Sequence, residues 1–373
     1  MEEITLILLS AGGSTRFGLG CKKQWLYQNR EPLWLKVAKD FESSFSFREI
    51  VVVAHETEKD YMSLFADYRF VTGGNSRQES LKNALESVKS GYVLVSDVAR
   101  CCIDTEMVQR ILSHMGEADC IVPAIGVADT VYLGAESVER DRIKLIQTPQ
   151  LSDTAILRKA LENGEYTDES SAIVGYGGSV LFVEGSHSAH KLTRVEDLKR
   201  IPCLKPPSPI HFCGFGIDTH SFEDGKKMYI CGVEIDSPFG FRAHSDGDVA
   251  IHALIDALLG ASGLGDIGSH FPDDDSSYEG VDSALLLEKS VEMVRSVGFE
   301  IVNVDMTIVA EVPRLARYRE RMRRRVAEIV GLRADRVSIK ATTSEKMGFI
   351  GRKEGVTVHA TATLGYFDWT EAV

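Results

Sequence analysis

A cluster of prolines divides the chain. Four of its ten prolines fall between Pro202 and Pro209, in the stretch IPCLKPPSPIHF. Each proline fixes φ and removes a backbone donor, so this stretch favours an extended connector. The alternative is an ordinary proline-rich loop inside one domain. A length of 373 residues also favours two domains over one. We therefore expect domains at residues 1–201 and 211–373, joined by a linker at residues 202–210.

Before the linker, short apolar runs alternate with helical patterns. The runs read ITLILL, IVVVA, YRFV, YVLVS, CIVPAI and SVLFVEG. Helical spacing covers residues 77–89, 105–115 and 153–163. Alternation of strands and helices predicts an α/β domain with a doubly wound, mostly parallel sheet.

Behind the linker the order of elements is different. Strands are expected at residues 211–217 and 228–235, and helices follow at 245–262 and 282–297. The remaining elements are a strand at 300–310, a helix at 313–330 and strands at 337–342 and 356–366. This order predicts a compact α+β unit.

The chain is acidic, and this limits its partners. Its 42 basic and 55 acidic residues give a formal net charge of -13. That balance argues against non-specific binding to nucleic acid or to anionic membranes. The seven arginines between Arg314 and Arg325 favour a solvated helix face over a nucleic-acid patch, because apolar residues recur at helical spacing among them. An anionic substrate must therefore be held by local lysines, arginines, metal or backbone N–H groups.

The sequence also predicts where the protein works. Its longest apolar stretches run about six residues, too short for a membrane span. The beginning, MEEITLILLSAGG, is acidic and enters a strand pattern directly, unlike a secretory signal. The seven cysteines form no C-x-x-C pair, and their odd number favours reduced thiols. We expect a soluble, cytoplasmic protein.

A first candidate site follows the first expected strand. The strand leads into SAGGSTRF, where small residues would let backbone N–H groups approach phosphate oxygens, and Arg16 and Lys23 supply cations nearby. The spacing matches neither G-x-G-x-x-G nor a Walker A loop, and a purely structural turn is the alternative. Asp97, at the end of another strand, is well placed to hold Mg²⁺, although it could instead cap the next helix.

A second candidate site lies behind the linker. Asp218 and His220 share one face of a strand, and Asp248 and His252 share one face of a helix capped near Ser245. Asp218, His220 and His252 could form a three-ligand zinc site with an open fourth position, as in catalytic zinc centres. Buried structural histidines are the alternative.

Residues 1–200 resemble the 2-C-methyl-D-erythritol 4-phosphate cytidylyltransferase family. The motifs SAGGSTRF with KKQ, GGNSRQESLKNAL, VSDVAR, IQTPQ, TDESSA and FVEG…HKLTRVEDL appear in family order. The resemblance implies a nucleotidyltransferase-like fold. It implies CTP over the loop, Mg²⁺ on Asp97, and catalytic roles for Arg16, Lys23, Arg140 and Lys191. The other nucleotide- or substrate-binding residues that it implies are Ala11, Gly12, Gly13, Ser80, Arg100 and Thr130.

Two departures from that family pattern stand near the metal. The family usually reads HDAARP where this chain has SDVARC, and PKQ where it has KKQ. The aspartate, the arginine and the lysine of these motifs are unchanged, so we interpret the two departures as tuning of the site rather than loss of activity.

Residues 212–366 resemble the 2-C-methyl-D-erythritol 2,4-cyclodiphosphate synthase family. The motifs are GIDTHSF, GVEI, AHSDGDVAIHALIDALLGASGLGDIGSHFPDDD, NVDMTIVAEVP and KATTSEKMGFIGRKEG. The resemblance implies zinc on Asp218, His220 and His252, a second metal on Glu345, and cytidine held by residues 310–315. It implies three packed copies with sites between neighbours. The other substrate residues that it implies are His244, Ser245, Asp266, Gly268, Thr342, Thr343, Phe349 and Arg352, with His244 and Thr343 catalytic.

Together the resemblances imply one chain with two non-consecutive steps of non-mevalonate isoprenoid synthesis. One domain transfers CMP from CTP to 2-C-methyl-D-erythritol 4-phosphate and releases pyrophosphate. The other cyclises 4-diphosphocytidyl-2-C-methyl-D-erythritol 2-phosphate to the 2,4-cyclodiphosphate and releases CMP. The implied cofactors are Zn²⁺ and Mg²⁺ or Mn²⁺. The expected assembly is based on a trimer, and a dimerising first domain would make it a hexamer. Co-assembly with the intervening kinase is a further hypothesis.

Two other interpretations compete. A regulatory protein could bind CTP and zinc without the chemistry, but this predicts damage at Lys23, Asp97 or Asp218, and all three are intact. The first domain could also serve another alcohol phosphate or sugar phosphate, against which Thr130, Arg140 and Lys191 argue.

Overall fold

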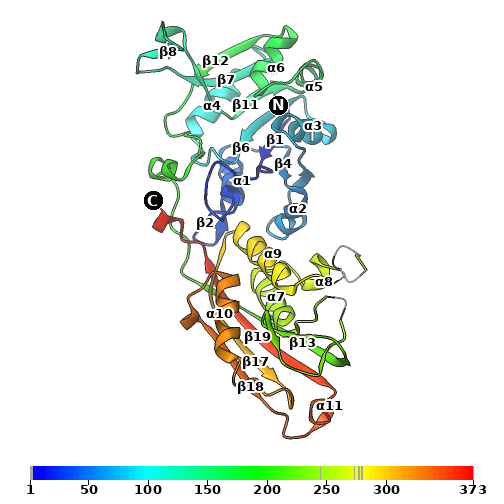
Figure 1. Cartoon of the computed structure of the whole chain (residues 1–373). Helices are drawn as coiled ribbons and strands as arrows, with labels where there is room; N and C mark the ends of the chain where they lie inside the picture. The colour runs from blue at the N-terminus through cyan, green and yellow to red at the C-terminus, as the bar shows by residue number, and fades with distance from the viewer. Residues whose placement is uncertain (1–2, 244, 273, 276–277, 279, 373) are drawn as a thin grey trace. The chain divides into compact units, whose positions relative to one another are not determined.

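The chain forms two compact units (Figure 1). The computed structural model describes residues 3–243, 245–272, 274–275, 278 and 280–372. The first unit comprises Met1–Pro206 together with Asp368–Val373, and the second comprises Pro207–Phe367. The second domain was expected to run to residue 373. The last residues join the first unit instead, because Trp369 is buried there and its indole Nε1 donates to the Tyr27 carbonyl at 2.8 Å.

An eight-stranded sheet organises the first unit. Its order is β10-β7-β11-β6-β1-β4-β5, with β12 paired to β7. β4 and β6 flank β1 in parallel, β5 is parallel to β4, and β12 is parallel to β7, whereas β10 and β11 are antiparallel. The doubly wound, mostly parallel sheet is thereby confirmed. The strands are β1 (Ile4–Leu9), β4 (Glu49–Ala54), β5 (Arg69–Thr72), β6 (Tyr92–Asp97), β7 (Cys120–Ile125), β10 (Leu145–Ile146), β11 (Gln150–Asp153) and β12 (Val180–Glu184).

Helices and two small hairpins complete the first unit. The helices are α1 (Leu33–Ser44), α2 (Glu56–Ser63), α3 (Arg77–Ser87), α4 (Thr105–Ser113), α5 (Thr154–Glu162) and α6 (Glu169–Tyr176). The hairpins pair β2 (Tyr27–Gln28) with β3 (Glu31–Pro32), and β8 (Val131–Leu133) with β9 (Glu136–Val138). The sequence pattern predicted α3, α4 and α5 but not α1, α2 or α6.

The second unit packs helices on a five-stranded sheet of order β16-β13-β19-β17-β18. Its strands are β13 (His211–Asp224), β16 (Phe239–Phe241), β17 (Phe299–Val309), β18 (Val337–Thr342) and β19 (Gly355–Tyr366). Its helices are α7 (Val249–Ser262), α8 (Ile267–His270), α9 (Ser283–Ser296), α10 (Arg319–Val330) and α11 (Gly348–Gly351). The expected strand at 228–235 is a hairpin of β14 (Met228–Ile230) and β15 (Val233–Ile235), because Cys231 and Gly232 adopt positive φ.

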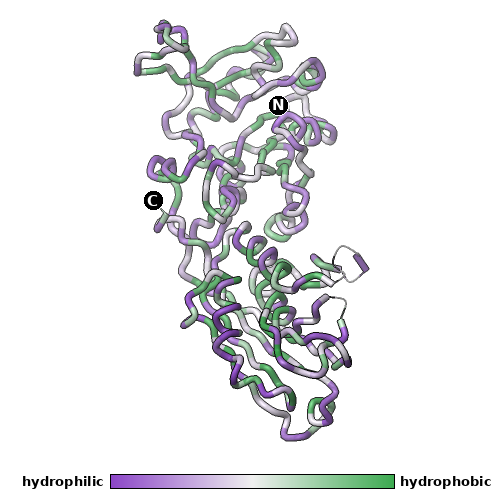
Figure 2. The backbone as a smooth tube through the Cα atoms, viewed as in Figure 1, coloured by the Kyte–Doolittle hydropathy of each residue, from purple (hydrophilic) through white to green (hydrophobic). Residues whose placement is uncertain are grey.

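The arginine-rich segment forms α10, which begins at Arg319 rather than at Pro313. Met322, Val326 and Ile329 are buried on one face. Along the exposed face Arg323 and Arg324 pair with Glu320, and Figure 2 shows the helix as largely hydrophilic. No helix among the described residues is long and apolar enough to cross a membrane.

Two glycines let α7 lie directly against β13. A Cβ added at Gly214 would lie 1.9 Å from the Ala257 carbonyl oxygen, and one at Gly216 would lie 2.0 Å from the Ala253 carbonyl oxygen. Backbone atoms in a helix cannot move aside as a flexible side chain can. The two glycines therefore set the distance between the helix and the strand.

The Gly216→Ala substitution should destabilise the second unit. The added methyl group must push α7 off the sheet, at a cost of about 1–3 kcal/mol or more. Gly260→Ala, in the same helix, is the control: its Cβ would meet nothing within 4 Å, and alanine favours a helix by up to about 1 kcal/mol. Hydrogen exchange of peptides from the second unit measures both effects. Equal protection in the two variants would contradict this packing argument.

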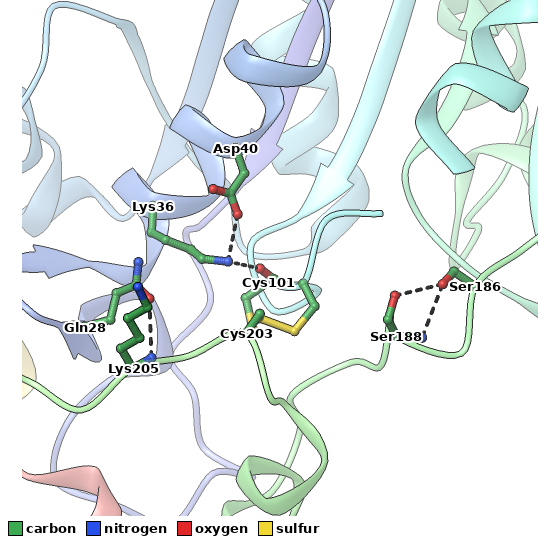
Figure 3. Close-up of a disulfide and its surroundings, with 9 residues drawn as sticks. Gln28, Lys36, Asp40, Cys101, Ser186, Ser188, Cys203 and Lys205 are labelled. Carbon is green, nitrogen blue, oxygen red and sulfur yellow. Dashed lines mark hydrogen bonds and ion pairs between the residues drawn. A yellow bond between two sulfur atoms is a disulfide. The ribbon is translucent and has the colours of Figure 1, made fainter. Parts of the chain in front are cut away.

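Cys102 and Cys203 form a disulfide, with their Cα atoms 5.5 Å apart (Figure 3). The expectation of reduced thiols throughout is wrong for this pair. The two cysteines are 101 residues apart in the sequence, so no short cysteine spacing indicates that they pair. The backbone brings them together, because Leu192 N donates to the Ala99 carbonyl at 2.8 Å and so pairs the segment before Cys203 with the turn after β6.

Removing the disulfide with Cys203→Ser should destabilise the first unit by about 2–5 kcal/mol, because the link restricts the unfolded chain. All three tryptophans of the chain, Trp25, Trp34 and Trp369, belong to this unit, so tryptophan fluorescence during urea unfolding reports on it alone. A thiol reagent should label five cysteines in the unreduced, unfolded wild type, since five are free. Labelling of all seven would contradict the disulfide.

Two candidate active sites

A first cavity opens at the carboxyl ends of β1 and β6. Its volume is about 360 Å³. It brings together eight of the residues expected from the sequence, which come from the loop after β1, from α3, from the end of β6 and from the segment after β12. They are Ala11, Gly12, Gly13, Arg16, Lys23, Ser80, Asp97 and Lys191. A larger cavity, at the amino ends of β4 and β5, contains none of the expected residues.

The loop after β1 is shaped by its own neighbours. Ser14 has a positive φ of 57°, and its hydroxyl accepts from Lys23 N at 3.0 Å. Gln24 Nε2 donates to the Gly12 carbonyl at 3.2 Å. A Cβ at Gly12 or Gly13 would meet nothing within 4 Å, so the glycines are not required by packing. Their role is more consistent with close approach of a ligand than with a structural turn.

Cations gather around this cavity. Lys23 is partly buried, and its Nζ donates to the Leu192 carbonyl at 3.2 Å. Burial lowers the pKa of Lys23, and the charges of Lys191 and Arg16 lower it further. Three cations that repel one another in one small space favour binding of a polyanion, which would relieve the repulsion.

Asp97 lies at the centre of an ion-pair network. Its Oδ1 accepts from Arg77 Nε at 3.1 Å, and its Oδ2 accepts from Lys191 Nζ at 2.6 Å. Burial alone would raise the pKa of this carboxyl, but Arg77 and Lys191 outweigh it and hold the pKa below its ordinary value. Asp97 is not a helix cap, because Asp104 caps α4 by accepting from Met107 N. An ionised carboxylate facing the cavity is a suitable ligand for Mg²⁺.

Three expected residues of the first unit do not line the first cavity. Arg100 instead donates to the carbonyls of Ala189 at 2.7 Å and Ile146 at 3.2 Å. Thr130 and Arg140 flank the exposed β8–β9 hairpin, and Arg140 donates to the Ala128 carbonyl at 2.9 Å. Within one chain, neither Thr130 nor Arg140 reaches the lining of the first cavity.

In the second unit, Asp218 and His220 of β13 meet His252 of α7. Asp218 Oδ2 lies 3.0 Å from His220 Nε2 and 3.3 Å from His252 Nδ1. The three ligand atoms lie within 4.8 Å of one another. They border a cavity of about 560 Å³, which Ser245 and Gly268 also line.

The outer nitrogen of each imidazole is held by a hydrogen bond. His220 Nδ1 contacts the Gly247 carbonyl at 3.0 Å, and a carbonyl can only accept. His252 Nε2 contacts Ser283 Oγ at 3.0 Å, and this hydroxyl donates to Asp246. In neutral imidazoles, protons on these outer nitrogens leave the inner nitrogens as lone pairs that face the Asp218 carboxylate. Two such nitrogens and one carboxylate oxygen form a donor set that fits a divalent metal such as zinc.

Asp248 does not share the metal-binding face of α7, contrary to expectation. The helix begins at Val249 rather than near Ser245, and Asp248 is its N-cap. The buried carboxylate accepts from Cys231 N at 2.9 Å and Gly232 N at 2.6 Å, in addition to the first helical N–H groups. Its role is structural.

Other expected residues of the second unit do not belong to the Asp–His–His cluster. Asp266 caps α8 by accepting from Ser269 N at 2.8 Å. Another group begins with the last residue of β18 and does not border the cavity beside the Asp–His–His cluster. It comprises Thr342, Thr343, Glu345, Phe349 and Arg352. His244 lies outside the described residues.

A glutamate that the sequence analysis missed shapes the loop after β18. Glu311 Oε1 accepts from Ser344 N at 3.2 Å and Lys346 N at 2.9 Å. Glu345 and Lys346 adopt positive φ in this loop, and Thr343 Oγ1 donates to Glu345 at 3.0 Å. The sequence placed Glu311 within residues 310–315, the segment that the resemblance assigns to cytidine, but gave no signal that its carboxylate holds another loop.

Comparisons with known proteins agree with the division of the chain into two units. The 2-C-methyl-D-erythritol 4-phosphate cytidylyltransferase family matches residues 4–203, and the YgbB family matches residues 212–365. The bifunctional enzyme IspD/IspF of Sulfurovum sp. is 55% identical over 372 residues, and that of Campylobacter curvus is 52% identical over 373; each comparison covers 100% of both chains. The solved structure of the bifunctional IspDF from Campylobacter jejuni has a TM-score of 0.93 and 45% identity, covering 99% of this chain and 100% of that one. The chain therefore belongs to the bifunctional IspD/IspF family.

Proposed function

We propose that each unit carries out one of the two reactions with the residues described above. The first unit transfers CMP from CTP to 2-C-methyl-D-erythritol 4-phosphate and releases pyrophosphate. The second cyclises 4-diphosphocytidyl-2-C-methyl-D-erythritol 2-phosphate to the 2,4-cyclodiphosphate and releases CMP. The observation that carries the proposal is a cavity lined by Arg16, Lys23 and Lys191 in one unit and an Asp–His–His cluster in the other, two sets of side chains suited to phosphate chemistry.

In the first reaction two polyanions must meet. A phosphate oxygen of the acceptor attacks the α-phosphorus of CTP, and the bond to the pyrophosphate oxygen breaks. Arg16 and Lys23 stabilise the charge on the equatorial oxygens, while the glycine loop offers backbone N–H groups. Magnesium, when bound at Asp97, would neutralise phosphate charge and orient the triphosphate.

Lys191, Thr130 and Arg140 would hold the acceptor. Lys191 lines the cavity, whereas Arg140 follows the exposed β8–β9 hairpin. That hairpin carries Tyr132 and Leu133, which are 63% and 78% exposed. Such exposure of large apolar side chains is typical of an interface. We infer that the hairpin reaches the cavity of a second copy. A preference for a sugar 1-phosphate in a panel of acceptors would instead support the alternative nucleotidyltransferase.

In the second reaction the 2-phosphate attacks the β-phosphorus of the diphosphate, and the bond to CMP breaks. Asp218, His220 and His252 would hold zinc, which when bound supplies Lewis acidity and orientation. Ser245, Asp266 and Gly268 would contact the erythritol phosphate. Glu345, with Thr342 and Thr343, would serve the cytidylyl half. Because these last residues do not border the metal cavity of their own chain, we infer a site between copies of a trimer.

Substitution at one site should leave the other reaction intact. We expect Lys23→Ala to slow pyrophosphate release at least about 100-fold, the scale for losing one transition-state donor, without changing CMP release. His252→Ala should do the reverse. Lys39→Ala and His114→Ala, at half-exposed positions away from both sites, are the matched controls. Loss of both activities in a folded single variant would refute two independent sites. If the wild-type chain released neither pyrophosphate nor CMP, the regulatory interpretation would be favoured.

Metal content provides a separate test of the second site. The purified chain should contain about one zinc ion, and Asp218→Asn should lower its zinc affinity by at least about tenfold, because the anionic ligand is lost. Elemental analysis after dialysis against a weak chelator measures the difference. Asp256→Asn, which borders the same cavity without belonging to the ligand cluster, is the control. Full zinc retention in Asp218→Asn would contradict the assignment.

A further inference from the structure

An ion pair between a partly buried guanidinium and a fully buried carboxylate adjoins Asp97. Arg77 is the first residue of α3, and Glu169 is the first residue of α6. The guanidinium of Arg77 binds both carboxylate oxygens of Glu169, from Nη1 at 2.7 Å and from Nη2 at 3.3 Å. The third guanidinium nitrogen, Nε, donates to Asp97 Oδ1 at 3.1 Å. One planar group therefore connects two carboxylates on two different elements.

Glu169 has no access to the cavity itself. It is 0% exposed and does not border the cavity, whereas Arg77 does. Burial raises the pKa of Glu169, and the charge of Arg77 opposes this shift. Burying a charged pair often stabilises a fold no better than apolar residues of similar size would. Stability alone therefore does not explain a partly buried arginine that pairs with a fully buried carboxylate and also contacts Asp97.

The two oxygens of Asp97 have different partners. Oδ1 faces Arg77, whose guanidinium plane is fixed by Glu169. Oδ2 faces Lys191, whose side chain is 39% exposed. Arg77 is fixed beside Oδ1, whereas the amine of Lys191 beside Oδ2 is partly exposed. Oδ2 is therefore the oxygen at which a metal ion can replace the present cationic partner.

We propose that Arg77 is a positioning residue that turns Asp97 to present a single oxygen to the divalent cation, and that Glu169 holds Arg77 in the plane this requires. The proposal rests on the function proposed for the first unit, in which Asp97 holds the metal. It follows from geometry, since a planar guanidinium can bind a carboxylate with one edge and donate from Nε, whereas a lysine ammonium is a point charge.

The test compares three variants of the full chain. Arg77→Lys keeps the charge but cannot bridge both carboxylates, and Glu169→Gln keeps one acceptor but loses the charge. Arg158→Lys is the control, because Arg158 holds the other end of α3 through the carbonyls of Leu85 and Val88, at 2.6 Å each. Binding of Mn²⁺ in the presence of CTP is followed by electron paramagnetic resonance, and Mg²⁺ activation is followed by pyrophosphate release.

In Arg77→Lys and Glu169→Gln we expect Mn²⁺ affinity to fall, and the Mg²⁺ activation constant to rise, by at least about tenfold, the scale for residues that orient metal ligands. Tryptophan fluorescence should report similar stability losses in all three variants. Unchanged metal constants in both test variants, or an equal shift in Arg158→Lys, would overturn the proposal.

A double substitution separates positioning from folding. Arg77→Met with Glu169→Leu removes the pair and leaves no unpaired buried charge, so this variant should unfold near the wild-type urea midpoint. It should nevertheless bind Mn²⁺ at least about tenfold more weakly; wild-type affinity would overturn the proposal. If wild-type protein binds Mn²⁺ with CTP but releases no pyrophosphate, the proposed reaction fails, while the metal-binding comparison still decides the role of Arg77.

Discussion

The ion-pair network around Asp97 determines how the first unit can bind phosphates. An acidic chain of net charge -13 cannot attract a triphosphate by its overall field. It concentrates Arg16, Lys23 and Lys191 at one cavity, and this is possible because the carboxyl ends of β1 and β6 meet at one edge of a parallel sheet. Asp97 offsets part of the resulting repulsion. The same contacts also connect the end of β6 to the segment that carries Lys191.

In the second unit, close packing between α7 and β13 determines which side chains meet. Successive side chains of a strand alternate between faces, so Gly214, Gly216, Asp218 and His220 share the face of β13 that meets α7. The two glycines admit the helix backbone, and the next two positions on the same face carry Asp218 and His220, which with His252 could hold a metal ion. His252 can reach Asp218 only because the helix lies this close. The Asp–His–His cluster and the helix–sheet packing therefore depend on one alternating pattern of residues.

Local signals in the sequence predicted what depends on local structure. Strand–helix alternation predicted the parallel sheet, and the β13 pattern predicted the Asp–His pair. The pairing of Cys102 with Cys203 and the docking of Trp369 depend on contacts across more than 100 residues, for which one sequence carries no spacing signal. The cap role of Asp248 was missed because its position relative to His252 is equally consistent with a shared helix face. α2 was missed because, among its eight residues, only Met62 is a buried apolar residue.

The central claim is that one chain carries two separate phosphate chemistries with different metal requirements. Two assays of the unmodified chain test it most directly: pyrophosphate release from CTP and 2-C-methyl-D-erythritol 4-phosphate with Mg²⁺, and CMP release from the cytidylylated 2-phosphate. Each is run with and without a zinc-selective chelator. Our account predicts that both proceed and that the chelator suppresses only CMP release. Equal suppression of both reactions, or no suppression of CMP release after zinc is removed, would contradict it.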